Sequence, residues 1–174
     1  MNSMNKALLI ALLMTGNTLL ADNGTDGVLT VLQADDLTVV FQGEQIYRGH
    51  CASCHGSELE GQPDWRVRDD NGYLPAPPHD ATGHTWHHAD DQLFEITKYG
   101  PGVVIGDTSY KTVMPAYKGL LTDNEIVAVL SYIKNSWPAE QREWQEQING
   151  TAAGPLDQGT AKDNKGTLLE RLFK

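Results

Sequence analysis

Apolar residues recur at helical spacing in three stretches of the chain, and polar or Gly-rich segments separate these stretches. The first stretch covers residues 44–54, and three of its residues share one face: Tyr47, Cys51 and Cys54. The second, residues 90–99, opens with two acidic residues, which suit a helix N-terminus, and Gly100-Pro101 ends it. Both stretches therefore predict helices.

The third helix has the clearest boundaries. Thr122 and Glu125 form the pattern of a capping box, and Pro138 stops the run. Four residues repeat at helical spacing between these limits: Ile126, Leu130, Ile133 and Trp137. A Gly-rich loop joins the second helix to the third, and no stretch predicts a convincing sheet. The pattern indicates a mainly α, loop-rich domain.

The flanking segments are less regular. Residues 27–42 are rich in β-branched side chains and predict a short hairpin or an extended arm. Residues 139–148 predict a short amphipathic helix, which a polar Gly-containing linker follows. The terminal residues 168–174 cluster apolar side chains and are expected to dock on the domain. We therefore divide the chain into a domain over 43–138, an N-terminal extension over 22–42, and a C-terminal helix with a mobile tail over 139–174.

The first 21 residues have the pattern of a cleaved secretory signal. Lys6 precedes a compact apolar run, and small Ala21 marks the expected cleavage point. No cysteine lies near Ala21, so attachment as a lipoprotein is excluded. An uncleaved anchor or a buried core helix is the alternative. Cleavage would change the formal net charge from −10 to −11. We expect a periplasmic protein, and the acidic charge excludes a nucleic-acid partner.

Both cysteines of the chain lie in the sequence "HCASCHG", residues 50–56. A structural zinc site usually needs a second ligand pair, and a thioredoxin-like pair needs a preceding strand. Covalent haem attachment uses both thiols and delivers the following histidine to the iron as an axial ligand. This chemistry alone accounts for Cys51, Cys54 and His55 together. The motif thus predicts one covalent haem c.

Met114 is the expected sixth ligand of the iron. The other methionines lie within residues 1–21, so Met114 is the only thioether of the mature chain. Pro115 stops a helix and holds Met114 on an extended loop. A thioether ligand favours ferrous iron and raises the reduction potential. A histidine is the rival ligand.

Four histidines crowd into residues 79–88: His79, His84, His87 and His88. An exported histidine cluster could hold copper or zinc. We favour a second interpretation, in which His84, His87 and Trp86 line the haem edge. A ring N–H would then donate to a haem propionate, and Trp86 would pack on the porphyrin.

With these motifs in view, residues 43–138 resemble a class I monohaem c-type cytochrome of the exported bacterial kind. The order of the motifs is the same: an N-terminal helix that leads into Cys-x-x-Cys-His, a middle helix, a Met-Pro loop and an aromatic-bearing C-terminal helix. The resemblance implies the class I cytochrome c fold, in which the first and last helices cross. It also implies thioether bonds to Cys51 and Cys54, with His55 and Met114 as axial ligands.

In that family a proline carbonyl receives the ring N–H of the axial histidine. Pro63 and Pro75 are the two candidates for this role in the present sequence.

We expect a one-electron carrier rather than an enzyme, because a six-coordinate iron leaves no site for substrate. It would shuttle electrons between redox proteins that carry a basic docking patch, with transient contact to membrane respiratory complexes. Two alternatives remain at this stage. One is the haem subunit of a periplasmic oxidoreductase that acts on a small inorganic substrate. The other is a cytochrome that handles copper or zinc through the cluster at His79–His88.

Overall fold

The computed structural model describes residues 30–107 and 109–152. Within them the chain forms seven helical elements: α1 (Leu37–His50), α2 (Ala52–His55), the 3₁₀ turn η1 (Thr85–His87), α3 (Asp90–Tyr99), α4 (Pro101–Val104), α5 (Asp123–Asn135) and α6 (Ala139–Ala152). This part of the chain contains no strand, only an isolated bridge between Lys118 and Leu121. The expectations for residues 1–29, which include the secretory signal and the start of the N-terminal extension, and for residues 153–174 lie outside the described residues.

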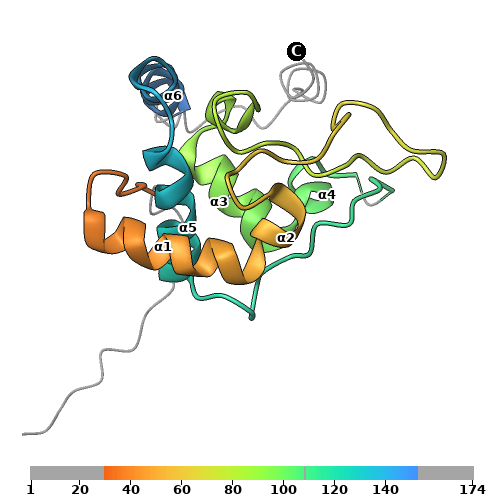
Figure 1. Cartoon of the computed structure of the whole chain (residues 1–174), viewed down its shortest axis with the longest axis horizontal. Helices are drawn as coiled ribbons and strands as arrows, with labels where there is room; N and C mark the ends of the chain where they lie inside the picture. The colour runs from red at the N-terminus through yellow and green to blue at the C-terminus, as the bar shows by residue number, and fades with distance from the viewer. Residues whose placement is uncertain (1–29, 108, 153–174) are drawn as a thin grey trace, which may run out of the picture.

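The crossing of α1 and α5 is the main packing contact of the domain (Figure 1). Gly43 lies at the crossing, where a Cβ atom would come within 2.0 Å of the carbonyl oxygen of Ala128. Only glycine allows the two helices to approach this closely. The buried core lies around the crossing and includes Tyr47, Ile126 and Val129, each at most 2 % exposed.

The helix α1 begins seven residues earlier than the sequence predicted. The Asp36 side chain caps it by accepting hydrogen bonds from the backbone N–H groups of Thr38 and Val39. The β-branched run that suggested a hairpin or an arm over residues 37–42 is therefore helical, because the cap and the packing on α5 outweigh its local preference. The helix also ends at His50, not Cys54, and a break at Cys51 separates it from α2.

An extended arm, residues 30–36, precedes α1 and lies on the domain. Its Leu32 and Ala34 side chains are buried. The N–H of Gln33 donates to the hydroxyl of Ser131 over 2.9 Å, and Asn135 donates to the carbonyl of Ala34 over 2.8 Å. The expected hairpin does not form over residues 30–36; they form an arm with a turn at residues 34 and 35, and α5 holds it.

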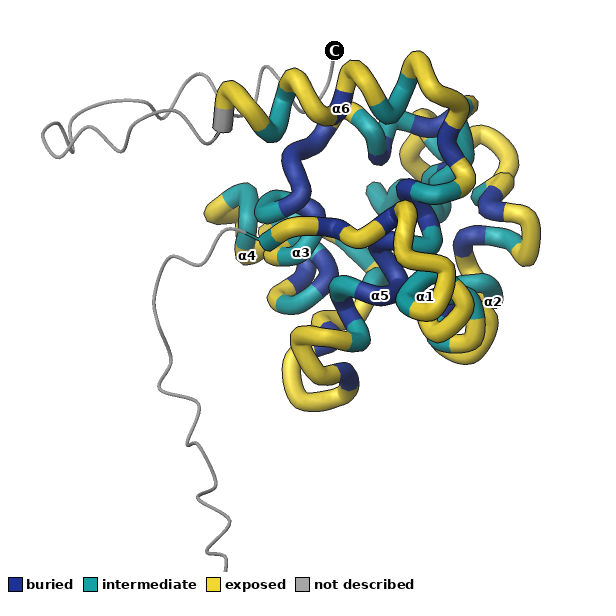
Figure 2. The backbone as a smooth tube through the Cα atoms, turned by 90° about the vertical axis from the view of Figure 1, so that its left-hand side faces the viewer, coloured by how far each residue is buried: buried dark blue, intermediate teal, exposed yellow. Residues whose placement is uncertain are grey.

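The helix α6 lies along one edge of the domain with most of its outer side exposed (Figure 2). It is attached through a polar group that is itself buried. The ammonium of Lys134 forms ion pairs with Asp90 and Glu146, and Gln145 donates to Asp90 over 2.7 Å. Arg142 pairs with Asp35 of the arm. Among the described residues, no helix combines the length and apolar character needed to cross a bilayer.

Candidate haem site

The Cys-x-x-Cys-His motif forms a single tight turn at the end of α1. The backbone N–H of His55 donates to the carbonyl of Cys51 over 2.9 Å, and Gly56 ends the turn with a φ of +81°. The Tyr47 hydroxyl donates to the Gly56 carbonyl over 2.8 Å. The turn therefore holds both thiols and the imidazole on one short, fixed segment.

The imidazole of His55 is oriented by a backbone carbonyl. Its Nδ1 lies 2.8 Å from the carbonyl oxygen of Pro77. A carbonyl can only accept, so Nδ1 carries the proton and Nε2 keeps its lone pair. Burial lowers the pKa of His55, which is 8 % exposed, and keeps the ring neutral near pH 7. A neutral imidazole with a fixed tautomer is the form that binds a metal.

The acceptor is Pro77, so the prediction of Pro63 or Pro75 was wrong. The reason lies in the backbone at Gly61, where φ is +68° and a Cβ atom would lie 2.4 Å from the nitrogen of Pro78. Glycine at this position lets the segment at residues 76–78 approach the motif. The N–H of residue 62 donates to the carbonyl of residue 76 over 2.9 Å and fixes the alignment.

His79 packs directly on the ring of His55. The two ring centroids are 4.0 Å apart and the planes are inclined by 21°. His79 is itself held, because its Nδ1 lies 2.8 Å from the Thr85 hydroxyl and its carbonyl accepts from the indole N–H of Trp137 over 2.8 Å. Its backbone N–H donates over 2.7 Å to Leu59, a buried non-glycine residue with a φ of +69°. Sequence reasoning counted His79 in the cluster but missed this stacking.

The four histidines of the cluster do not converge on one point. His84 stacks on Trp65 at 5.2 Å, and His87 stacks on Trp86 at 3.7 Å. His88 contacts Gln92 through Nδ1 and is buried. Within the described residues there is no group of three or more His, Cys, Asp or Glu side chains that could hold a metal ion. The copper or zinc alternative gains no support from this arrangement.

Two buried nitrogen atoms in the same segment have no hydrogen-bond partner among the described residues. They are Nδ1 of His84 and Nε1 of Trp86. Burial lowers the pKa of His84 to about 4, so its ring is neutral near pH 7. The indole N–H of Trp86 can only donate. A buried donor calls for an acceptor, and a haem carboxylate would supply one.

Met114 lies on the long loop between α4 and α5, and Tyr117 ties this loop to the cysteine motif. Met114 is partly buried and packs against the core cluster, as do Cys51 and Trp86. The Tyr117 hydroxyl donates to the carbonyl of His50 over 2.7 Å. The structure thus brings the loop of Met114 to the motif through a residue that sequence reasoning did not single out.

The two thiols are unpaired, and Cys51 is the less exposed of the two. Cys51 and Cys54 form no disulfide. Burial raises the pKa of the Cys51 thiol to about 11, against a smaller opposite effect of the Tyr117 hydroxyl. Unpaired thiols, a neutral imidazole and an unpartnered indole N–H together fit a covalently bound haem.

The comparisons with known proteins agree with this geometry. The cytochrome c family model matches residues 40–137, which is more than half of the chain. No curated protein and no solved structure gave a significant match.

Proposed function

The chain belongs to the cytochrome c family, with haem-based electron transfer as its function and haem c as its covalent cofactor, and we propose that it is a one-electron carrier. Cys51 and Cys54 form the thioether bonds to the haem. His55 and Met114 are the residues that would hold the haem iron. The observation that carries the proposal is the buried, neutral His55, which directly follows two unpaired thiols and donates Nδ1–H to Pro77.

The haem supplies a reversible one-electron step between ferric and ferrous iron. The protein holds the imidazole for that step. The hydrogen bond from Nδ1 to Pro77 increases the basicity of Nε2 and sets the rotation of the ring, and the stack of His79 limits that rotation further. The hydrogen bond to Pro77 and the stack of His79 can both stay the same in the two oxidation states, which favours fast electron transfer.

Met114 is supported as the sixth ligand by what surrounds it. Its backbone N–H donates to the Thr112 hydroxyl over 3.0 Å, and Pro115 follows it directly. Of the rival histidines, His79 stacks nearly parallel to His55, and a ring in that position cannot bind the opposite face of the iron. His84 and His88 are likewise engaged in their own contacts.

The sixth ligand also separates a carrier from the haem subunit of an oxidoreductase. An iron bound by His55 and Met114 has no open position for an inorganic substrate, whereas a catalytic site needs one. Cyanide titration of the ferric holoprotein tests this difference. We expect slow binding to the wild type, fast binding to Met114→Ala, and wild-type behaviour in Val113→Ala, whose side chain is 70 % exposed on the same loop. Rapid binding to the wild type would favour the oxidoreductase subunit.

Covalent attachment has a direct test of its own. Acid–acetone extraction should leave the haem on the polypeptide, and the mass should exceed that of the mature chain by one haem. Cys51→Ala and Cys54→Ala should each lower the yield of holoprotein. His55→Ala should lower it further, because axial ligation also organises the fold. Freely extractable haem or a Cys51–Cys54 disulfide would refute the assignment.

We place the carrier in the periplasm. Haem attachment to two thiols and the secretory pattern of residues 1–21 both favour an exported protein. N-terminal sequencing of the holoprotein should find a start next to Ala21, whereas a start at Met1 in membrane fractions would indicate an anchor. The formal net charge of −10 favours redox partners with a basic docking patch, including membrane respiratory complexes in transient contact.

A further inference from the structure

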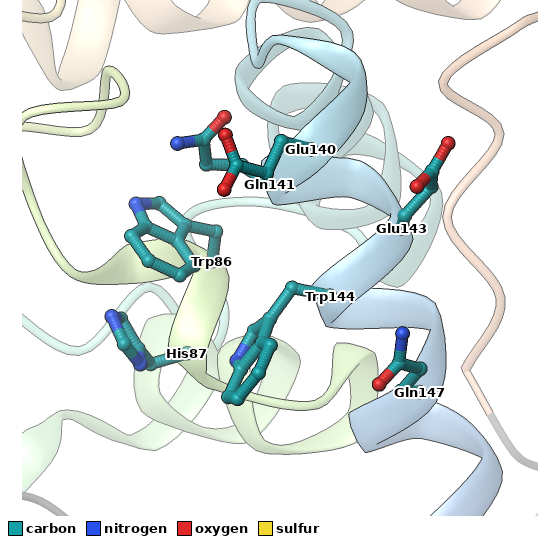
Figure 3. Close-up of a pocket in the computed structure, with 7 residues that line it drawn as sticks. All are labelled: Trp86, His87, Glu140, Gln141, Glu143, Trp144 and Gln147. Carbon is teal, nitrogen blue, oxygen red and sulfur yellow. The ribbon is translucent and has the colours of Figure 1, made fainter.

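A cavity of about 330 Å³ lies between the histidine segment, residues 79–88, and α6 (Figure 3). Trp86 and His87 form one wall, and Trp144 of α6 forms the facing wall. Glu140, Gln141, Glu143 and Gln147 complete the lining. Apart from Trp86 and His87, these residues belong to α6, which lies beyond the 40–137 match to the family.

The walls of the cavity are aromatic rings that lie side by side. Trp86 and His87 stack at 3.7 Å, and the ring of Trp144 meets His87 edge-on at 6.4 Å. Trp144 is 50 % exposed, so part of its ring is open to a partner. The faces of tryptophan rings attract cations, and arginine also stacks on them.

The cavity carries negative charge, which attracts such a cation. Glu140 and Glu143 form no ion pair among the described residues, and Glu140 lies on the side of Trp86 (Figure 3). Burial lowers the pKa of His87, so its ring adds no positive charge near pH 7. The cavity therefore carries one uncompensated carboxylate, that of Glu140, beside the aromatic faces, and Glu143 adds negative charge farther from the rings (Figure 3).

The side-chain oxygen of Gln141 indicates which kind of cation the cavity would bind. The side-chain oxygen of Gln141 is buried and has no donor among the described residues. A buried acceptor of this kind calls for an N–H group. An ammonium or guanidinium group can donate to Gln141 and Glu140, whereas a quaternary ammonium ion has no N–H to offer.

We propose that this cavity is the docking site for an arginine or lysine side chain of the redox partner. The inference rests on the proposed carrier function, which requires brief contact with such a partner. A partner protein is favoured over a free small molecule because the cavity opens on an exposed tryptophan of a surface helix. Tryptophan and arginine are the residues most often responsible for binding energy at protein interfaces. Trp86 then links the docked side chain to the segment that carries His79 and His84.

The test uses the ¹⁵N-labelled ferrous holoprotein and a tetra-arginine peptide as the probe. We expect saturable shifts of the indole N–H signals of Trp86 and Trp144. Glu140→Gln and Trp144→Leu should each weaken binding by about tenfold, as expected for the loss of a charged hydrogen bond or an aromatic face. Glu95→Gln, an equal charge change at an exposed position of α3, is the matched control and should leave binding unchanged.

Three results would overturn the inference. The indole signals could stay unshifted, or Glu95→Gln could weaken binding as much as Glu140→Gln, which would indicate general charge attraction. Tetramethylammonium could also shift the same signals at lower concentrations than the peptide, which would indicate a small-molecule site. Electron exchange with an uncharged small mediator does not use the cavity. Normal exchange in a protein that fails the peptide test would therefore remove the docking inference and leave the carrier function intact.

Discussion

The substitution Gly43→Ala tests the helix crossing on which the haem motif depends. The added methyl group would lie 2.0 Å from the carbonyl oxygen of Ala128 and 2.9 Å from Cβ of Tyr132, whereas ordinary contact begins at 3.4 Å. The closest atom belongs to the backbone, so no side-chain rotation can relieve the clash. The helices α1 and α5 would have to separate, and the Cys-x-x-Cys-His turn begins at the end of α1.

The expected loss of stability follows from this geometry. Overpacking of a core costs about 1–3 kcal/mol, and a clash between two backbones belongs at the upper end. For a domain of this size, a loss of about 3 kcal/mol lowers Tm by about 10 °C or more. The separation of the helices should also weaken the contact of Tyr117 with His50, which lies at the end of α1.

The matched control is Gly49→Ala on the same helix. A methyl group there meets nothing within 4 Å, so only the helix propensity changes. Alanine should stabilise the helix by about 0.5–1 kcal/mol. Thermal unfolding of both ferric holoproteins, followed by circular dichroism, compares them directly. If Gly43→Ala proved as stable as Gly49→Ala, the close crossing of α1 and α5 would be refuted.

Three further predictions concern the contacts around the site. Tyr117→Phe should lower the free energy of unfolding by about 1 kcal/mol, because it removes the 2.7 Å hydrogen bond to the His50 carbonyl. An unchanged midpoint of chemical denaturation would contradict this prediction. His79→Ala should lower the reduction potential by admitting water beside His55, the proposed axial ligand, whereas His79→Phe keeps the stacked ring and should restore the potential. Equal potentials in both variants would argue against stacking. Lys134→Met should lower the free energy of unfolding by about 3 kcal/mol, because it leaves the carboxylate of Asp90 buried without its cation. Proteolysis within α6 should increase. An unchanged free energy of unfolding would contradict the prediction.

Local signals predicted the helices that have clear ends. The capping box at Thr122 forms both of its hydrogen bonds, and α5 follows it as expected. The stretch at residues 90–99 is α3, and the predicted amphipathic helix is α6, which extends to Ala152. In these segments the residues at the helix ends and the spacing of apolar residues act within a few residues of one another. A sequence pattern reports such interactions directly.

The early start of α1 shows where local signals fail. Thr38 and its β-branched neighbours favour extended backbone, so the sequence predicted a helix only from residue 44. The Asp36 cap was visible in the sequence and could have indicated the start. The role of Gly43 was not visible, because it depends on Ala128 of a helix 85 residues away in the chain.

The residues of the site likewise divide into those that their spacing in the sequence predicts and those whose role depends on the fold. Cys51, Cys54 and His55 could be proposed from their spacing alone, because haem attachment places its requirements on adjacent residues. The acceptor of His55 could not, since Pro77 is 22 residues away and its approach depends on the backbone of Gly61. The stacking of His79 is a consequence of that same approach. Composition showed a histidine cluster, but only the fold reveals that its members face different partners.

The described segments outside the family match, residues 30–39 and 138–152, are part of the same folded unit. Asp90 lies at the start of α3, and its side chain accepts from the N–H of Leu32 over 3.1 Å and from Gln145 over 2.7 Å. Its backbone N–H donates to Asn149 over 2.9 Å. One buried carboxylate thus binds the arm, α3, α6 and, through Lys134, α5. Because α6 is fixed at this point, Trp144 faces His87 at a defined distance, and the cavity between them belongs to the fold rather than to a loosely attached helix.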